Sequence, residues 1–263
     1  MRVLELYKGT GSIGSVCEQL GFKVISLDIE KKYNPTIVAD IMKWDYKKEF
    51  KPGDFDLITT SPVCLFWSRL RNTWIGRKCK SIHPTEVITK QHLLDDIEKY
   101  GKPMVDKTFE IIDYFKPKYW WIENPNSSYM WKYIDEKHSN RNFETYIFDY
   151  CKYSDWGYKK PTRFITNYKG VETLRCKNDC ENILTIEKQK IHSDRMGTSK
   201  TIKTEEGKII RCNTKALREK YKDYPNIQQN KKINKIRKGN SRDERYRIPH
   251  KLIKELLKPI LEK

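Results

Sequence analysis

The first half of the chain alternates between short apolar runs and segments with helical periodicity. Apolar and β-branched residues concentrate at 2–7, 23–28 and 56–60, and turn-forming residues follow each run. Runs of this length and composition are typical of buried strands. Residues 13–20 and 104–115 instead place apolar side chains three and four positions apart, which predicts helices. The alternation predicts an α/β fold with a doubly wound, mostly parallel sheet wrapped by helices.

Weaker patterns add further strands to the predicted sheet. A short strand ends near Asp40, and a strand following the second helix ends at Ile122. Beyond the middle of the chain, 145–150 and 163–167 predict two strands joined by a turn at 154–157.

The remaining pattern predicts how the chain is divided into parts. After the last strand it becomes polar, basic and weakly periodic, which predicts a loop-rich lobe. Helical spacing returns after Pro249, a residue type that fits the first turn of a helix. We expect an α/β catalytic domain over 1–167, a small target-recognition lobe over 168–230, and a C-terminal segment over 231–263 that returns to the first domain.

The charge balance indicates a polyanionic partner. The chain has 53 Lys and Arg residues against 35 Asp and Glu residues, a formal net charge of +18. Nucleic acid is the commonest partner of such a surface, because basic side chains release counterions from phosphates. A Lys-rich composition with no bearing on function is the alternative.

Cysteine usage and hydropathy limit the setting in which the protein acts. Seven cysteines, an odd number spread over a long chain, do not form the pattern of a disulfide framework. No run approaches the ~20 apolar residues that a membrane helix needs. Residues 2–7 have the pattern of a strand and not of a leader. We expect an intracellular monomer with reduced thiols and no membrane partner.

The first strand-to-helix turn has the composition of a nucleoside-binding loop. Gly9 and Gly11 lack a Cβ atom, so the backbone there can approach a ligand closely. Asp28 ends the second strand, where an acid can bind a ribose diol, and Asp40 ends the third, near the place of an adenine amino group. A lone Gly-x-Gly is equally typical of a tight turn, but the two acids together favour a cofactor.

A thiol and a carboxylic acid follow neighbouring strands of the predicted sheet. Cys64 comes after the strand at 56–60, and Glu123 comes directly after Ile122. Parallel strands end at the same edge of a sheet, so both side chains are expected to face one pocket. Alone, a cysteine after a strand is more often a small buried hydrophobe, and Glu123 is equally compatible with a helix-capping segment.

Together the two groups suit methyl transfer to cytosine. The C5 atom of cytosine is a poor nucleophile until a thiolate adds to C6 and an acid protonates or hydrogen-bonds N3. That route needs a cysteine, a carboxylic acid and a methyl sulfonium donor beyond the ring. Cys64, Glu123 and the glycine turn supply these parts in the order of the sheet.

Four short segments resemble the motifs of DNA (cytosine-5)-methyltransferases. Residues 61–68 resemble the Pro-Pro-Cys-Gln-x-Phe-Ser motif, and 123–125 resemble Glu-Asn-Val. Residues 6–14 resemble Phe-x-Gly-x-Gly, and 239–241 match the final Gly-Asn-Ser. The motifs span nearly the whole chain in the family's order, as in short phage and viral members.

The resemblance implies a Rossmann-like class I methyltransferase fold that uses S-adenosylmethionine and releases S-adenosylhomocysteine. Cys64 is then the nucleophile, Glu123 the acid on the base, and Asn124 a support for the catalytic loop. Arg163 matches the second arginine of the family's Gln-x-Arg-x-Arg. The implied cofactor contacts are Tyr7, Gly9, Thr10, Gly11, Ser12, Asp28, Asp40, Ile41, Pro62 and Asn240.

Three departures from the motifs leave alternatives open. Val63 replaces a proline, Leu65 a glutamine and Pro161 the first arginine. We expect transfer to C5 of cytosine in DNA, through a covalent Cys64–C6 intermediate. Transfer to RNA, such as transfer RNA, and a catalytically degenerate nucleic-acid-binding relative are the alternatives.

The target carbon is accessible only on an unstacked nucleotide, so base flipping or a single strand is required. The segment after Cys64 mixes cations with Trp74, which either fills the vacated space in the stack or belongs to the core. The expected phosphate contacts are Arg69, Arg71, Arg77, Lys78 and Lys80.

One group of residues raises the question of a metal. Cys176 and Cys180 precede His192, and Cys212 is a possible fourth ligand. Structural zinc needs four ligands, commonly with a tighter Cys-x2-Cys spacing. Unpaired loop thiols are therefore the preferred interpretation, and no metal is expected.

Overall fold

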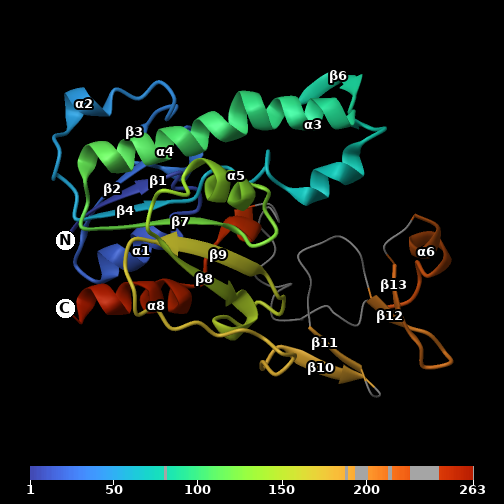
Figure 1. Cartoon of the computed structure of the whole chain (residues 1–263). Coiled ribbons are helices and arrows are strands. Elements are labelled where there is room, and N and C mark those ends of the chain that lie inside the picture. The colour runs from blue at the N-terminus through green and yellow to red at the C-terminus, as the bar shows by residue number, and fades with distance from the viewer. Residues whose placement is uncertain (80–81, 187–188, 193–200, 213–214, 226–242, 263) are drawn as a thin grey trace.

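A seven-stranded sheet forms the centre of the computed structural model (Figure 1), which describes residues 1–79, 82–186, 189–192, 201–212, 215–225 and 243–262. β9 runs antiparallel to both of its neighbours, and the other strand pairs are parallel. The predicted doubly wound, mostly parallel α/β sheet is thereby confirmed. In spatial order the strands are β3 (Ile37–Val38), β2 (Lys23–Asp28), β1 (Arg2–Leu6), β4 (Leu57–Thr60), β7 (Tyr119–Pro125), β9 (Pro161–Thr166) and β8 (Glu144–Asp149).

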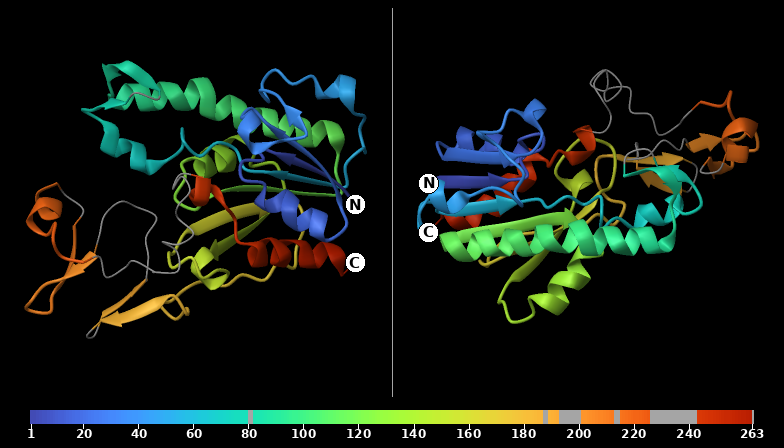
Figure 2. Two further views of the ribbon diagram at one scale, coloured as in Figure 1. Left: turned by 180° about the vertical axis from the view of Figure 1, so that it is seen from behind. Right: turned by 90° about the horizontal axis from the view of Figure 1, so that it is seen from above.

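Helices cover both faces of this sheet (Figure 2). Successive side chains of a strand point to opposite faces, so Val3 and Leu4 of β1 belong to two different cores. The core containing Val3 packs against α1 (Ser12–Gln19) and α8 (His250–Leu261). The core containing Leu4 packs against α2 (Tyr46–Glu49), α4 (Lys102–Phe115) and α5 (Met130–Lys137).

β7 is longer than its hydrophobic pattern predicts. The strand continues past Ile122 to Pro125, because β9 pairs along its whole length and places Glu123 opposite Phe164 and Pro125 opposite Thr162. Glu123 and Asn124 therefore lie on a strand and not in a loop.

Shorter elements, including the separate two-stranded sheet of β5 and β6, connect β4 to α4. The chain after β4 forms η2 (Arg69–Trp74), β5 (Lys78–Cys79) and β6 (His83–Val87), and then joins α4 through α3 (Lys90–Asp96) and the π-helical turn η3 (Ile97–Gly101). The remaining short turns are η1 (Lys31–Tyr33), η4 (Tyr150–Lys152) and η5 (Asp243–Tyr246).

The described part of the basic lobe contains hairpins as well as loops. Two antiparallel strand pairs and one short helix occur there, set to one side of the main sheet (Figure 1). Within the described ranges, no helix is both long enough and apolar enough to span a membrane. The lobe's elements are β10 (Ile183–Ile186), β11 (Gln189–His192), β12 (Thr201–Lys203), β13 (Ile209–Arg211) and α6 (Lys215–Lys220).

Candidate active site

The strand that precedes Cys64 and the strand that contains Glu123 are neighbours in the sheet. β4 and β7 run parallel with Thr60 opposite Ile122, so the segment that follows Thr60 leaves the sheet beside Glu123. The side-chain amide of Asn124 donates a hydrogen bond of 2.8 Å to the carbonyl of Pro62. This bond ties β7 to the loop that bears the thiol.

Glu123 is an acid held in a low-dielectric place. Glu123 is 7% exposed, and burial raises the pKa of its carboxyl. The charge of Lys160 and the hydroxyl of Ser61 act in the opposite direction. A raised pKa keeps a carboxyl protonated toward neutral pH, the state from which it can donate to a ring nitrogen.

Cys64 is half-buried, and burial raises the pKa of its thiol. The charge of Glu123 raises it further, whereas the ammonium of Lys160 lowers it. The two pKa values are thus linked: once Glu123 is neutral it no longer opposes ionisation of the thiol. A neutral acid and a thiolate are the pair that attack on C6 with protonation of N3 requires.

The sequence interpretation missed Lys160. The pKa of its ammonium is lowered by burial and raised by Glu123 and Cys64, and its Nζ lies 4.8 Å from the ring centroid of Tyr150. Neighbouring residues of extended chain point to opposite sides, so Lys160 and Pro161 face different ways. This alternation could have indicated Lys160 from the sequence, because it places Lys160 and Thr162 together on the face opposite Arg163.

The structure does not bring Arg163 to this pair. Its guanidinium lies 3.3 Å from both Asp135 Oδ1 and Thr145 Oγ1, and 4.7 Å from the ring centroid of Trp131. The resemblance matches Arg163 to the family's second arginine, and here its guanidinium contacts Asp135 and Thr145 instead of the pair formed by Cys64 and Glu123. The reason is register: Arg163 pairs with Asn124, and its side chain emerges over α5.

The cofactor loop departs from ordinary backbone geometry. Tyr7, Gly9 and Gly11 have φ values of 57°, 50° and 69°, which glycine adopts freely and tyrosine does not. The amide of Gly9 donates 2.8 Å to Asp28 Oδ2, and the amide of Glu30 donates 2.8 Å to Asp28 Oδ1. Asp28 thus holds the loop against the end of β2, where the sequence predicts a ribose contact.

Glu5 is a second residue that the pattern alone did not single out. It lies within β1, yet burial raises the pKa of its carboxyl to about 7. Its Oε1 accepts a hydrogen bond of 3.0 Å from the amide of Gly14, and a Cβ atom on Gly14 would lie 2.5 Å from its Oε2. Gly14 is therefore required so that α1 can approach this acid.

The other expected cofactor residues surround the same loop. Asp40 accepts a hydrogen bond of 3.0 Å from the amide of Met42, and its charge acts on Tyr7. Ile41 and Pro62 are buried, and the side chain of Ile41 belongs to the core. The hydroxyls of Thr10 and Ser12 lie 3.2 Å apart at the start of α1.

These residues fit a nucleoside cofactor that carries a positive sulfonium. Gly9 has no contact closer than 3.9 Å at the position of a Cβ atom, which leaves room for a ligand against the backbone. The Oε2 atom of Glu5 is buried without a hydrogen-bond partner. A buried carboxyl with an unpartnered oxygen and an open glycine turn, both near the end of β1, provide a polar group and close backbone access.

The C-terminal segment does return to this end of the sheet. The amide of Ile248 donates 3.2 Å to the hydroxyl of Ser12, and the hydroxyl of Tyr33 donates 2.8 Å to Asp243. These contacts place the residues just before α8 against the start of α1 and against η1. Asn240 itself lies outside the described residues.

The expected phosphate contacts divide into two groups. Arg69, Arg77 and Lys78 are exposed, and the guanidinium of Arg69 lies 5.2 Å from the ring centroid of Tyr129. Arg71 is 2% exposed and pairs with the buried Asp96, so the expectation that it contacts phosphate is wrong. Burial and pairing make Arg71 a structural cation. Lys80 lies outside the described residues.

The two tryptophans of this segment also differ. Trp67 is buried in the core, and Trp74 is half-buried beside the guanidinium of Arg71 at 5.6 Å. Trp67 is therefore a packing residue. Trp74 helps to enclose the buried Arg71.

The metal expectation is changed by the tertiary structure. Cys176, Cys180 and His192 do come together, but their fourth neighbour is Cys151. Cys212 is fully buried and does not belong to this group. The sequence could not indicate Cys151, because it lies 25 positions before Cys176, beyond any local ligand spacing.

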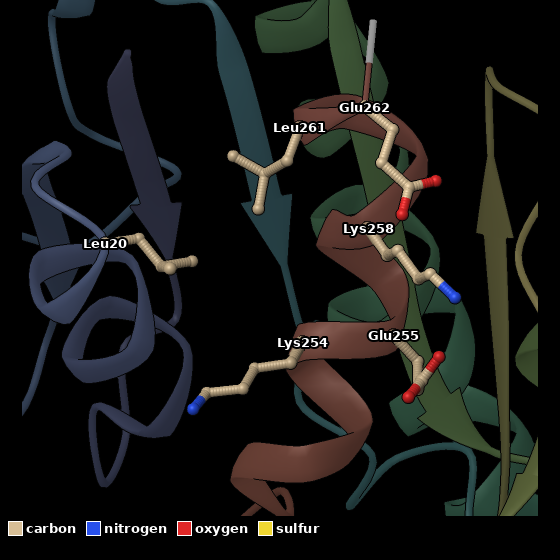
Figure 3. A pocket seen from close by; sticks show the side chains of 6 residues that line it. All are labelled: Leu20, Lys254, Glu255, Lys258, Leu261 and Glu262. Atoms are coloured by element: carbon tan, nitrogen blue, oxygen red, sulfur yellow. The ribbon is translucent and has the colours of Figure 1, made fainter.

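One surface hollow lies apart from the candidate site residues. The hollow in Figure 3 has a volume of about 310 Å³ and lies between the end of α1 at Leu20 and the outer face of α8. Its lining includes Lys254, Glu255 and Lys258, which have no contact with Cys64 or Glu123. The chemistry of the molecule therefore lies at the sheet edge and not in this hollow.

The sheet order, the glycine turn after β1 and the polar ends of β4 and β7 together define a Rossmann-like class I methyltransferase. Comparison with a known protein is more specific. The chain is 37% identical over 187 residues to a probable DNA (cytosine-5)-methyltransferase of frog virus 3 (isolate Goorha), covering 70% of this chain and 79% of that protein. The chain belongs to the DNA (cytosine-5)-methyltransferase family, which implies S-adenosylmethionine as methyl donor and nucleic acid as substrate.

Solved structures of similar fold share little sequence with this chain. The Dnmt2 methyltransferase of S. pombe has a TM-score of 0.49 at 14% identity, covering 100% of this chain and 98% of that chain. The methyltransferase EhMeth of Entamoeba histolytica has a TM-score of 0.46 at 15% identity. The match covers 70% of this chain and 58% of the EhMeth chain, which is less than two thirds of it. At these TM-scores neither structure bears on the substrate. A scan of protein-family models finds no match.

Proposed function

We propose that the protein methylates C5 of cytosine in DNA through a covalent Cys64–C6 adduct, with the base flipped out of the helix. The observation that supports this most is the electrostatic linkage of Cys64, Glu123 and Lys160 at the joint end of β4 and β7. The name of the viral relative favours DNA over RNA.

In this proposal each residue has a defined task. The Cys64 thiolate adds to C6 while Glu123 gives its proton to N3, which places electron density on C5. C5 then takes the methyl group, and S-adenosylhomocysteine leaves. A base removes the proton from C5, the bond from sulfur to C6 breaks, and N3 returns its proton to Glu123. Bound S-adenosylmethionine supplies an electrophilic methyl group.

Lys160 acts on the thiol and not on the methyl group. Its ammonium lowers the pKa of Cys64, whereas burial and Glu123 raise it. We assign Lys160 the task of favouring the thiolate when substrate closes the site and excludes water.

Trapping with 5-fluorocytosine tests the proposal directly. Fluorine on C5 cannot leave as a proton, so the adduct that forms after methyl transfer persists. The full chain is incubated with S-adenosylmethionine and a duplex containing 5-fluorocytosine, and parallel samples contain a mismatched duplex, single-stranded DNA or transfer RNA with the same base. We expect a denaturation-resistant complex with DNA, mapped to Cys64 by peptide mass spectrometry.

Two controls make the outcome decisive. Cys64→Ala must abolish the complex, and Cys212→Ala, which removes a buried thiol elsewhere, must leave it intact. A complex with transfer RNA alone overturns DNA as substrate. Binding of nucleic acid without any adduct or methyl transfer shows a degenerate relative and overturns the proposal.

A further inference from the structure

A second set of thiols gathers away from the sheet edge that bears Cys64. The sulfur atoms of Cys151, Cys176 and Cys180 and a ring nitrogen of His192 all lie within 4.8 Å of one another. Cys151 lies in η4, directly after β8, and His192 ends β11. Three separate segments therefore converge on one point.

The distances within this group suit one ion at its centre. The Nε2 atom of His192 lies 3.5 Å from the sulfur of Cys176 and 3.5 Å from the sulfur of Cys180. A tetrahedral zinc with bonds of about 2.3 Å to sulfur and about 2.0 Å to nitrogen places its sulfur and nitrogen ligands roughly 3.6 Å apart. One ring nitrogen facing two sulfurs at this spacing is the arrangement that a shared cation produces.

Hydrogen bonds hold the ligand-bearing segments in place. The backbone amide of Cys176 donates 2.7 Å to Asp149 Oδ2, and Lys159 donates 2.7 Å to the carbonyl of Cys176. The side chain of Asn182 donates 2.9 Å to the carbonyl of Cys151 and 2.8 Å to that of Ser154. Fixed outer contacts of this kind orient metal ligands before an ion binds.

The charges around the group match a metal–thiolate centre. Zinc with three thiolates and a neutral histidine carries one net negative charge. The ammonium of Lys152 interacts electrostatically with Cys176 and Cys180, and it pairs with Asp179 at 2.8 Å. Lys159 lies close enough to act on His192. Cations on several sides stabilise such a centre.

We propose that Cys151, Cys176, Cys180 and His192 form a structural zinc site. All four ligands come from the protein, so no open position remains for catalysis. The ion joins the end of the α/β domain, through Cys151, to the start of the lobe, through Cys176 and Cys180, and to the hairpin β10–β11, through His192. Its task is to hold the lobe beside the domain that bears Cys64.

Metal analysis of the purified full chain tests this site independently of methyl transfer. The protein is purified under reducing conditions without chelator and dialysed. Its zinc and iron contents are then measured by inductively coupled plasma mass spectrometry. We expect about one zinc per chain. If zinc is low, the reduced chain is reconstituted with zinc chloride and dialysed again, and a value near zero at this stage overturns the proposal.

Cobalt substitution reports the ligands. Cobalt in place of zinc is expected to give the visible bands of a tetrahedral site and a near-ultraviolet sulfur-to-cobalt charge-transfer band. His192→Cys keeps four ligands and is expected to retain the metal with a stronger charge-transfer band. His192→Ala is expected to lower zinc retention. Equal metal content in wild type and His192→Ala would contradict the assignment.

A matched thiol variant and a redox measurement complete the test. Cys212→Ala removes a buried thiol outside the group and is expected to leave the zinc content unchanged. Loss of zinc in Cys212→Ala with retention in Cys151→Ala would overturn the ligand set. A disulfide between Cys176 and Cys180 in protein kept under reducing conditions would also overturn it.

Discussion

Thiols occur in two regions of this molecule with opposite surroundings. Cys64 stands at the end of β4 beside one buried acid and one lysine. Cys151, Cys176 and Cys180 surround a single histidine instead. The same side chain is thus suited to attack in one region and to metal binding in the other, and its neighbours decide which.

The two regions also differ in how well their polar groups are satisfied. At the sheet edge, Tyr7 has a φ of 57°, Asn124 Oδ1 is buried without a hydrogen-bond partner, and Glu5 is buried with a raised pKa. Around the thiol group, Asn182 and Lys159 bind the backbone of the ligand-bearing segments. Functional sites commonly retain strain that the rest of the fold must offset. We therefore expect variants of Cys64 and Glu123 to change activity, and variants in the thiol group to change stability.

The largest expected effect is the loss of activity in Cys64→Ala. Removal of a nucleophile commonly lowers the rate by about 10⁴-fold or more. Methyl transfer to DNA, measured with labelled S-adenosylmethionine, should fall by that order while zinc content and the urea midpoint stay at wild-type values. A Cys64→Ala protein that transfers methyl at more than a tenth of the wild-type rate would break the contrast between the two regions.

Glu123→Gln is expected to lower the rate by roughly 10²- to 10⁴-fold, because the variant cannot transfer a proton to N3. Burial raises the pKa of Glu123, so the wild-type enzyme holds the acid form to higher pH and loses activity as pH rises through that raised pKa. At low pH the thiolate of Cys64 is lost. The residual activity of the variant should keep rising with pH until Cys64 ionises.

The control for this pH profile is Glu136→Gln, an exposed acid on α5. Its profile of kcat against pH should match that of wild type. If the activity of Glu123→Gln still falls at high pH as in wild type, that fall must come from the titration of another group.

Glu5→Gln is expected to change the pH dependence of the free energy of unfolding. The zinc content of the thiol group should stay unchanged. The pKa of Glu5 is raised to about 7, against about 4.3 in an unfolded chain. The folded state therefore keeps this proton between those values, and its contribution to stability is lost as pH rises through 7. The loss is on the order of 3 kcal/mol, and it is absent in Glu5→Gln.

Urea unfolding at several pH values between 4 and 8 measures this difference. The wild-type free energy of unfolding should fall relative to that of Glu5→Gln as pH rises. Glu136→Gln, which removes an exposed acid of α5, should follow wild type. Parallel curves for wild type and Glu5→Gln would contradict the raised pKa.

The smallest expected effect uses two adjacent lysines that face different regions. Lys160→Met removes the cation that lowers the pKa of Cys64, and should lower the rate at neutral pH severalfold, because a smaller fraction of the thiol ionises. The loss should shrink as pH rises, and Lys160→Arg should restore part of the rate. Lys159→Met should leave the rate unchanged and weaken zinc retention, because Lys159 binds the carbonyl of Cys176. If Lys160→Met and Lys159→Met had the same effects on rate and on zinc retention, the two lysines would not serve different regions.

Much of the fold followed from local pattern. The parallel strands of the first half, the helix over 104–115 and the helix after Pro249 all have strong periodicity, and the structure contains them. Boundaries that depend on pairing did not follow: β7 extends to Pro125 because β9 pairs with it. A hydrophobic run shows that a strand exists, but its partner sets its length.

The reactive residues divide in the same way. The sequence by itself determined which residues are candidates, namely Cys64, Glu123 and the glycine turn, because each lies at or just beyond the carboxyl end of a predicted strand. Only the tertiary structure decided that Lys160 and not Arg163 faces the thiol, that Arg71 is buried against Asp96, and that Cys151 and not Cys212 joins Cys176, Cys180 and His192. Side-chain direction and long-range proximity depend on register and packing between segments far apart in the chain, and no local spacing encodes them.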